Sequence, residues 1–228
     1  MKIEIWSDVV CPFCYIGKRK FEKALNEFHG KDRVKVEWKS FQLDPETKTD
    51  AQVSVYEYLA ERKGMSVEHS KEMHQQVAML ANEAGLDFNF DKTMVANTFD
   101  AHRILHLAAK YGKQTEAEER LFAAYFTEGK NIADFDTLVE LAKEIGIKQD
   151  EAKIALENLS FTQQVNEDIH EAQELGIRGV PFFVFNRKFA VSGAQSPEIF
   201  AQALQKAWEE DGEIEIIKGD SCEVDGDC

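Results

Sequence analysis

The nine residues from Val9 to Gly17, VVCPFCYIG, place two cysteines at the junction between two kinds of sequence pattern. Before this stretch, residues 2–7 (KIEIWS) alternate between polar and apolar types, as a strand does. After it, apolar residues recur at helical spacing until Gly30, and residues 33–43 alternate again. The order predicts a β-α-β unit with the cysteine pair where the first strand meets the helix.

The proline between the two cysteines favours a helix that begins at this point. Proline suits the first helical position, so Cys11 is expected to be the N-cap and Pro12 the first residue of the helix. The Cys11 sulfur would then face unpaired N–H groups and the positive end of the helix dipole, which favour a thiolate. Cys14 is expected to be less exposed and to resolve a mixed disulfide formed on Cys11. Pro12 and Phe13 are expected to contact the substrate.

Two other uses of a Cys-x-x-Cys pair are less consistent with this chain. A zinc site needs four ligands, and Cys222 and Cys228 would have to supply two of them across a spacing wider than usual. A purely structural disulfide between Cys11 and Cys14 would close too short a loop to constrain much of the chain. We therefore predict a redox pair and no metal.

The middle of the chain has a helical pattern from about residue 52 to residue 178. Strand character within it is limited to residues 86–90, LDFNF. Glycines in the C-cap position predict helix ends at Gly85, Gly112, Gly129 and Gly146.

Strand patterns return after this block. Residues 181–186 and 188–194 flank Asn186–Arg187 and predict a hairpin, and Pro197 begins a last helix that runs to about residue 210. The order of elements predicts an α/β, thioredoxin-like fold with a large all-helical insertion. The expected domains are a discontinuous thioredoxin-like domain, residues 1–50 and 176–228, and an inserted helical domain, residues 51–175.

A second informative stretch, GIRGVPFFVFN, contains a proline that opens a predicted strand. Proline inside a sheet loses a ladder hydrogen bond, which a cis Val180–Pro181 bond would explain, although a trans proline at the strand entry is the ordinary alternative. The presence of Cys-Pro-Phe-Cys in the same chain favours cis. We therefore expect Pro181 to belong to the catalytic site and the backbone of Val180 to be open for pairing with an extended peptide.

Composition narrows the class of protein further. The chain has 27 Lys and Arg against 42 Asp and Glu, a net charge of −15, which disfavours nucleic acid and anionic membrane surfaces as partners. No apolar run approaches the ~18 residues of a membrane span. Met1 leads directly into the first strand pattern with no apolar leader segment, so a cytoplasmic location is expected.

Three separated stretches, SDVVCPFCYIGKRKFEKAL, NTFDAHRILHLAAKYGK and GIRGVPFFVFNRKFAVSGAQ, resemble the DsbA-family thiol oxidoreductases of the FrnE type. The resemblance covers nearly the whole chain. It implies a redox site at Cys11 and Cys14, a cis-proline at Pro181 and a cytosolic member of the family. Partners would be disulfide- or thiol-containing proteins or peptides, with glutathione as a candidate redox partner or substrate and no bound cofactor.

A related branch contains 2-hydroxychromene-2-carboxylate isomerases and kappa-class glutathione transferases, which this chain resembles in fold. Members of that branch carry serine at the position of Cys11 and lack the second cysteine. The departure at these residues argues against isomerase or transferase activity.

The middle stretch carries Asn97, His102 and Arg103. One interpretation places all three in a groove opposite Cys11, with Arg103 attracting a thiolate or a glutathione carboxylate. The alternative is an N-cap formed by Asn97 or Thr98, with ordinary surface or packing roles for the others. His102 and His106 have the spacing of metal ligands on a helix, but a third ligand is missing from the pattern, so packing is favoured.

The tail CEVDGDC holds a second pair, Cys222 and Cys228. The Asp225–Gly226 turn signal allows the two sulfurs to come within disulfide range, and so short a loop would add little stability. One hypothesis is a secondary redox pair that exchanges electrons with Cys11–Cys14. The other is an incidental, oxidisable tail.

The favoured function is a thiol–disulfide oxidoreductase acting through its Cys-Pro-Phe-Cys pair. The first rival is a glutathione-dependent isomerase or transferase, and the second is a holdase-type chaperone without thiol chemistry. The sequence is compatible with an oxidase, a reductase or an isomerase of disulfides, and with a monomer or a homodimer.

Overall fold

The computed structural model describes residues 1–209, 215–217 and 222–223. The chain divides into two units, residues 1–43 with 163–228, and residues 44–162. The expected divisions lie at 50/51 and 175/176, so helix α8 (Thr162–Glu174) belongs almost entirely to the sheet unit instead of the insertion.

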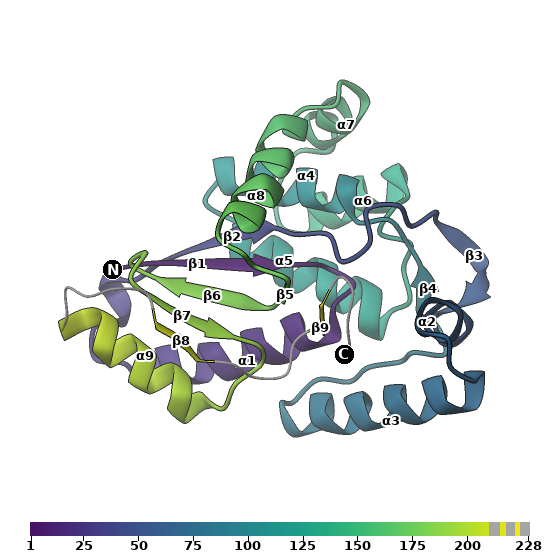
Figure 1. Ribbon diagram of the computed structural model, residues 1–228. Helices are drawn as coiled ribbons and strands as arrows, with labels where there is room; N and C mark the ends of the chain where they lie inside the picture. The colour runs from purple at the N-terminus through teal and green to yellow at the C-terminus, as the bar shows by residue number, and fades with distance from the viewer. Residues whose placement is uncertain (210–214, 218–221, 224–228) are drawn as a thin grey trace. The chain divides into compact units, whose positions relative to one another are not determined.

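The first unit is built on a mixed five-stranded sheet in the order β2-β1-β6-β7-β8 (Figure 1). The pair β1–β2 is parallel, β1–β6 and β6–β7 are antiparallel, and β7–β8 is parallel. The strands are β1 (Lys2–Ser7), β2 (Lys35–Ser40), β6 (Phe182–Phe185), β7 (Phe189–Ser192) and β8 (Glu215–Ile217). Thus the first strand of the chain lies beside a strand that follows the insertion.

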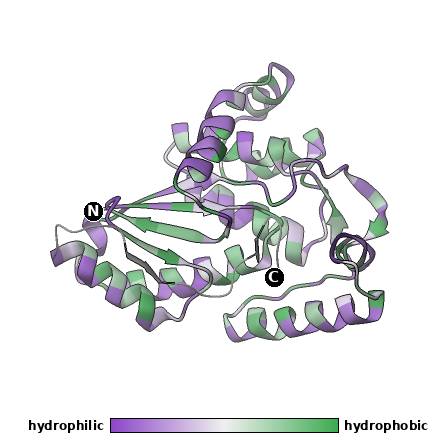
Figure 2. Cartoon of the chain, viewed as in Figure 1, coloured by the Kyte–Doolittle hydropathy of each residue, from purple (hydrophilic) through white to green (hydrophobic). Residues whose placement is uncertain are grey.

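One face of the sheet packs against α1 (Pro12–Glu27) and α9 (Pro197–Glu209), which lie side by side. Alternation along β1 and β6 brings Ile5 and Phe183 into register on this face. The Phe183 ring lies 4.6 Å from the Phe200 ring of α9, between ring centroids. Figure 2 shows that β6 is hydrophobic along much of its length. Burial of each such side chain contributes about 1.5–3 kcal/mol and holds the two helices to the sheet.

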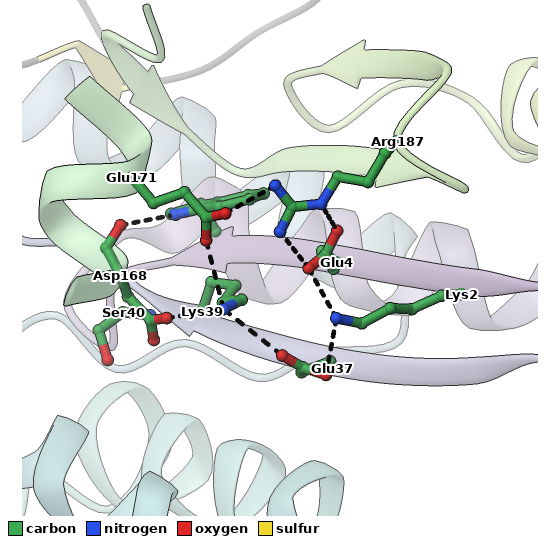
Figure 3. Close-up of polar contacts among 9 residues, drawn as sticks. Lys2, Glu4, Glu37, Lys39, Ser40, Asp168, Glu171 and Arg187 are labelled. Carbon is green, nitrogen blue, oxygen red and sulfur yellow. Dashed lines mark hydrogen bonds and ion pairs between the residues drawn. The ribbon is translucent and has the colours of Figure 1, made fainter. Parts of the chain in front are cut away.

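The opposite face carries charged side chains, which join the sheet to α8 (Figure 3). Asp168 of α8 accepts hydrogen bonds from Lys39 Nζ and from the backbone N–H of Ser40, both at 2.9 Å. Its own carbonyl oxygen accepts from Trp6 Nε1 at 3.0 Å. Burial alone would raise the pKa of Glu171, but hydrogen bonding to Arg187 and the nearby Lys39 lower it instead. The contacts therefore fix α8 on the sheet.

The same network extends across β1 and β2. The buried carboxylate of Glu4 pairs with Arg187 of the β6–β7 turn and with Lys2 Nζ, the latter at 2.8 Å. Lys2 Nζ also lies 3.1 Å from Glu37. Because α8 continues through a short connection into β5 (Gly179–Val180), this network anchors the segment that leads to Pro181.

Shorter segments complete the first unit. A short 3-10 turn, η1 (Lys31–Arg33), joins α1 to β2. The predicted hairpin around Asn186–Arg187 is confirmed, and both turn residues have positive φ angles, 50° and 58°. Near the end of the chain, β8 pairs with β7, and β9 (Cys222–Glu223) pairs with β5.

The second unit is mainly helical. Its helices are α2 (Val55–Lys63), α3 (Val67–Glu83), α4 (Phe99–Lys110), α5 (Gln114–Phe122), the π-helical segment η2 (Ala123–Thr127), α6 (Phe135–Glu144) and α7 (Gln149–Glu157).

A small antiparallel sheet in this unit was not expected from the sequence. It consists of β3 (Asp50–Ser54) and β4 (Met94–Val95). The expected strand at residues 86–90 is irregular instead. There Phe88 stacks on Phe126 with ring centroids 4.5 Å apart, and Asn89 donates its backbone N–H to the Phe126 carbonyl. Aromatic packing against the π-helical turn thus takes the place of strand pairing.

Within the described ranges, no helix is both long enough and apolar enough to cross a membrane. The α/β, thioredoxin-like fold with a largely helical insertion is confirmed by these two units.

We expect Asp168→Ala to lower the free energy of unfolding by about 2–3 kcal/mol, because it removes two charge-assisted hydrogen bonds and leaves Lys39 short of its buried partner. Urea unfolding followed by circular dichroism measures the change. Glu174→Ala on the same helix is the control, since its exposed carboxylate should contribute less than about 0.5 kcal/mol. Equal losses in the two variants would contradict the role assigned to Asp168.

Candidate functional site

The N-terminus of α1 has the capping arrangement that the sequence predicts. Cys11 is the N-cap, with φ −86° and ψ 113°, and Pro12 occupies the first helical turn. The Cys11 N–H donates to the Asp8 carbonyl at 2.9 Å, and the Cys14 N–H donates to the Cys11 carbonyl at 3.1 Å. No acidic side chain lies in the first turn of this helix. The positive end of the helix dipole is therefore not neutralised by a carboxylate of its own first turn.

Both cysteines of the motif are free thiols, and both are fully buried. The expectation that Cys11 is the more exposed of the two is wrong, because each has a relative exposure of 0%. The difference between them lies in their electrostatic surroundings instead.

Burial raises the pKa of the Cys14 thiol well above its ordinary value, and its interaction with the Cys11 sulfur raises it further. Hydrogen bonds from the Asp8 backbone N–H and the Ser7 hydroxyl act in the opposite direction. Cys14 is therefore held as a thiol near neutral pH, while two donors stand ready to stabilise its thiolate when it forms. This is the behaviour required of a resolving cysteine.

The segment that opens β6 approaches the motif from the other end of the chain. The Val180–Pro181 bond is cis. The Cys11 sulfur lies 3.5 Å from the Val180 carbonyl oxygen and donates its thiol proton to it. Residues separated by 169 positions in the sequence thus meet at this sulfur.

The backbone of Val180 is not open for pairing, which corrects the sequence-based expectation. Strand β5 pairs antiparallel with β9 of the tail, in the register Val180↔Cys222 and Gly179↔Glu223. The backbone of Cys222 therefore lies opposite the residue that contacts the Cys11 sulfur. Its predicted partner Cys228 lies outside the described residues.

The two other residues of the motif differ in exposure. Phe13 is buried, with 6% of its surface exposed, and Pro12 is half-buried. A role for Phe13 in contacting substrate stays a prediction, and burial limits how much of its ring a substrate could reach.

Arg103 has a structural role in the second unit, which corrects its assignment to a binding groove. Its buried guanidinium donates to the carbonyl oxygens of Ala155, Leu156 and Ser160, at and beyond the end of α7, and pairs with Asp100 at 2.5 Å. With every nitrogen of its guanidinium bound in this way, Arg103 stabilises the C-terminus of α7.

Asn97 has a local structural role at the start of α4, where Thr98 is the N-cap and Asn97 precedes it. Its side-chain oxygen accepts from the Phe99 N–H at 2.9 Å, at the start of α4. Its amide donates to the carbonyls of Pro45 and Thr47 at 3.2 and 3.0 Å. His102 is buried in the same helix. The described part of the chain holds no cluster of three or more His, Cys, Asp or Glu that could bind a metal.

Ser7 is the site residue that sequence reasoning missed. It is the last residue of β1 and almost fully buried, with 1% of its surface exposed. A sequence signal was present, because a polar residue ends a strand of buried residues just before the cysteine motif. Its contact with the Cys14 sulfur depends on the turn between β1 and α1, which the pattern alone does not specify.

Comparison with known proteins identifies relatives of the whole chain. Residues 2–205 match the family model described as a DSBA-like thioredoxin domain. The chain is 32% identical over 206 residues to the uncharacterized protein YwbO of Bacillus subtilis (strain 168), which covers 89% of this chain and 94% of that protein.

Among the solved structures that are similar in fold, two are informative here. The probable DsbA oxidoreductase SCO1869 from Streptomyces coelicolor is 37% identical with a TM-score of 0.87, over 99% of this chain and 97% of that chain. The cytosolic disulfide reductase DsbM from Pseudomonas aeruginosa, also solved with GSH, is 19% identical with a TM-score of 0.63, over 90% of this chain and 97% of that chain. The second likeness is one of fold alone.

We expect Ser7→Ala to slow the attack of Cys14 on a Cys11–glutathione mixed disulfide by about tenfold at neutral pH. Loss of the hydroxyl donor raises the already raised pKa of Cys14, so less thiolate is present. The measurement is the pH dependence of glutathione release. The curve should move to higher pH, and the two proteins should converge at alkaline pH.

Ser40→Ala, the same change at the register partner of Ser7 in β2, is the control. An unshifted pH curve for Ser7→Ala, or an equal shift in both variants, would contradict a specific effect on Cys14.

Proposed function

Since the chain belongs to the family of DSBA-like thioredoxin domains, we propose that it is a thiol–disulfide oxidoreductase that works through its Cys-Pro-Phe-Cys pair. Its substrates are proteins, peptides or small molecules that contain a disulfide or a thiol. The observation that carries this proposal is the placement of two free thiols at the start of α1, with the Cys11 sulfur 3.5 Å from the Val180 carbonyl.

In the reductive direction, the Cys11 thiolate attacks one sulfur of a substrate disulfide. The substrate S–S bond breaks, the departing sulfur takes the electron pair and a proton, and Cys11 is joined to the substrate. Cys14 then loses its proton and attacks the Cys11 sulfur, which releases the second substrate thiol. Two electrons pass from the Cys11–Cys14 dithiol to the substrate, and the reverse sequence oxidises a substrate dithiol.

The different surroundings of the two thiols support this order of events. The pKa of Cys14 is raised by burial and by the neighbouring Cys11, so Cys14 keeps its proton near neutral pH until the second step requires it. Formation of the mixed disulfide removes the negative charge of Cys11 and with it part of the cause of that raised pKa. The second attack therefore becomes easier once the first has taken place.

The backbone of Val180 is the proposed docking edge for an extended substrate. An incoming peptide would displace β9 from β5, pair with β5 in its place and carry its sulfur to Cys11, and Pro181 would shape the edge next to it. Pro12 and Phe13 would contact the same peptide from the start of α1.

Glutathione is the small thiol partner that we propose, and the cytoplasm is the proposed location. Support comes from DsbM, a protein of the same fold described as a cytosolic disulfide reductase and solved with GSH. The close spacing of the cysteines in two pairs is also typical of redox use in a reducing compartment.

We expect Cys11→Ser to reduce insulin-disulfide exchange to the uncatalysed rate, because it removes the attacking sulfur. Cys14→Ser should instead accumulate a Cys11–glutathione adduct, visible by intact-protein mass spectrometry, because the resolving sulfur is missing. Exchange by Cys11→Ser at the wild-type rate would contradict the proposal.

Variants at the same two cysteines distinguish the rival functions. Glutathione-dependent turnover of an aromatic substrate that survives Cys14→Ser would favour an isomerase or transferase. Suppression of aggregation by Cys11→Ala at the wild-type level, with no disulfide exchange by the wild type, would favour a holdase.

The tail pair is proposed as a secondary redox pair that exchanges with the motif. The pairing of β9 with β5 supports this role, because it puts the backbone of Cys222 at the register position that a substrate cysteine would take. In the relay, the Cys11 thiolate attacks Cys222 of a Cys222–Cys228 disulfide and Cys228 leaves as a thiol. Cys14 then attacks Cys11 and releases Cys222, so two electrons move from the motif to the tail.

We expect Cys14→Ser to form an intramolecular Cys11–Cys222 disulfide when the protein is oxidised in the absence of glutathione. Peptide mapping by mass spectrometry under non-reducing conditions detects the crosslink. Cys14→Ser/Cys222→Ser is the control and should lack it. A protein in which Cys11 pairs only with a second molecule or with Cys228 would contradict the register-based assignment.

A further inference from the structure

Gly17 lies inside α1, one turn beyond Cys14. Glycine has a lower helix propensity than every residue except proline, so its presence here works against the helix. A Cβ atom at this position would lie 3.0 Å from Cγ of Pro181 and 3.5 Å from both Cα and Cβ of Ala194. The bare backbone of Gly17 is thus the surface on which the proline ring rests.

The segments that press on Gly17 are held in place from the other side. The Pro181 carbonyl accepts the Gly193 N–H at 2.8 Å, which joins the start of β6 to the end of β7. Ala194 follows Gly193, and its carbonyl oxygen accepts a hydrogen bond from Lys20 Nζ of α1 at 3.1 Å. A side chain at Gly17 could therefore be accommodated only by moving Pro181 together with the residues bonded to it.

Such a movement would change the distance between the Cys11 sulfur and the Val180 backbone. Val180 immediately precedes Pro181, and its carbonyl lies 3.5 Å from that sulfur. Cys11 is the N-cap of α1 and Gly17 lies within its N-terminal half. The position of α1 therefore determines both where the Cys11 sulfur lies and where the Pro181 ring makes contact. The contact at Gly17 thereby determines how closely the Val180 backbone approaches Cys11.

We propose that Gly17 is a positioning residue for disulfide exchange. Its missing side chain seats Pro181 on α1 and sets the separation between the Cys11 sulfur and the Val180 backbone, along which a peptide disulfide is presented. The inference rests on the proposed oxidoreductase function and adds to it a specificity for extended peptide substrates. A purely packing role for Gly17 would alter stability without selecting between peptide and small-molecule reagents.

The test is Gly17→Ala, assayed in two ways. A methyl group displaces Pro181 by a few tenths of an ångström, so kcat/KM for a synthetic disulfide peptide should fall about tenfold, by the sensitivity of reactions to misplaced groups. Alkylation of Cys11 by iodoacetamide needs no docking edge, so its rate should stay within about twofold of the wild type, since the N-terminus of α1 is unchanged.

Asn26→Ala is the matched control, because it replaces an exposed polar residue of α1 by alanine away from Pro181. It should leave both rates unchanged. Pro181→Ala supplies the second comparison, since it removes the ring atom nearest to Gly17. Adding Gly17→Ala to Pro181→Ala should cost little further activity if the two residues act through one contact. The double variant also keeps the test informative if Gly17→Ala alone folds poorly, because the conflicting ring is gone.

The outcomes separate this inference from the function on which it rests. Full peptide exchange by Gly17→Ala, or equal losses in peptide exchange and alkylation, would overturn the positioning role and leave the oxidoreductase intact. Additive losses in the double variant would overturn it as well. A wild-type protein that exchanges no disulfide at all would overturn both.

Discussion

The antiparallel pairing of β1 with β6 is the interaction on which the rest of the structure depends. It joins the first strand of the chain to a strand that begins 180 residues later, with Ile3 opposite Phe185 and Trp6 opposite Phe182. The cysteine motif follows directly after β1, and Pro181 immediately precedes β6. Because antiparallel partners run in opposite directions, the end of one strand lies beside the start of the other. The meeting of Cys11 with Val180 is therefore a consequence of this single register.

The two faces of the sheet stabilise this arrangement by different means. Apolar side chains on the α1–α9 face contribute the bulk of the burial, without directional preference. Charged groups on the α8 face are directional and unite residues distant in sequence, as Lys39 and Asp168 do. Buried ion pairs add little net stability, but an unmatched partner is costly, so they select one placement of α8 over alternatives. That placement in turn sets where β5 begins.

Sequence patterns identified what is local in this fold. The start of α1 at the Cys-Pro step and the turn at Asn186–Arg187 follow from the conformational preferences of the residues themselves. The packing of α8 against the sheet could not be predicted in this way, because it depends on contacts with a residue 128 positions away in the sequence, Ser40. Arg103 was misassigned for the same reason, since the carbonyls it binds come from a helix end 52 residues further on. The exposure of Cys11 also depends on which segments pack over it, and the spacing of residues in the motif does not predict those segments.

The strand β9 introduces a competition at the docking edge that no local pattern contains. A sheet edge with unpaired N–H and C=O groups readily accepts another strand, and β5 offers such an edge next to the reactive sulfur. A segment of the same chain has the advantage of a high effective concentration over a free peptide. Within the described residues the pairing covers Gly179 and Val180, so this part of it supplies few hydrogen bonds and can be exchanged for those of a longer peptide. An edge held by so short a strand is protected from indiscriminate association and is still available to a substrate that pairs over more residues.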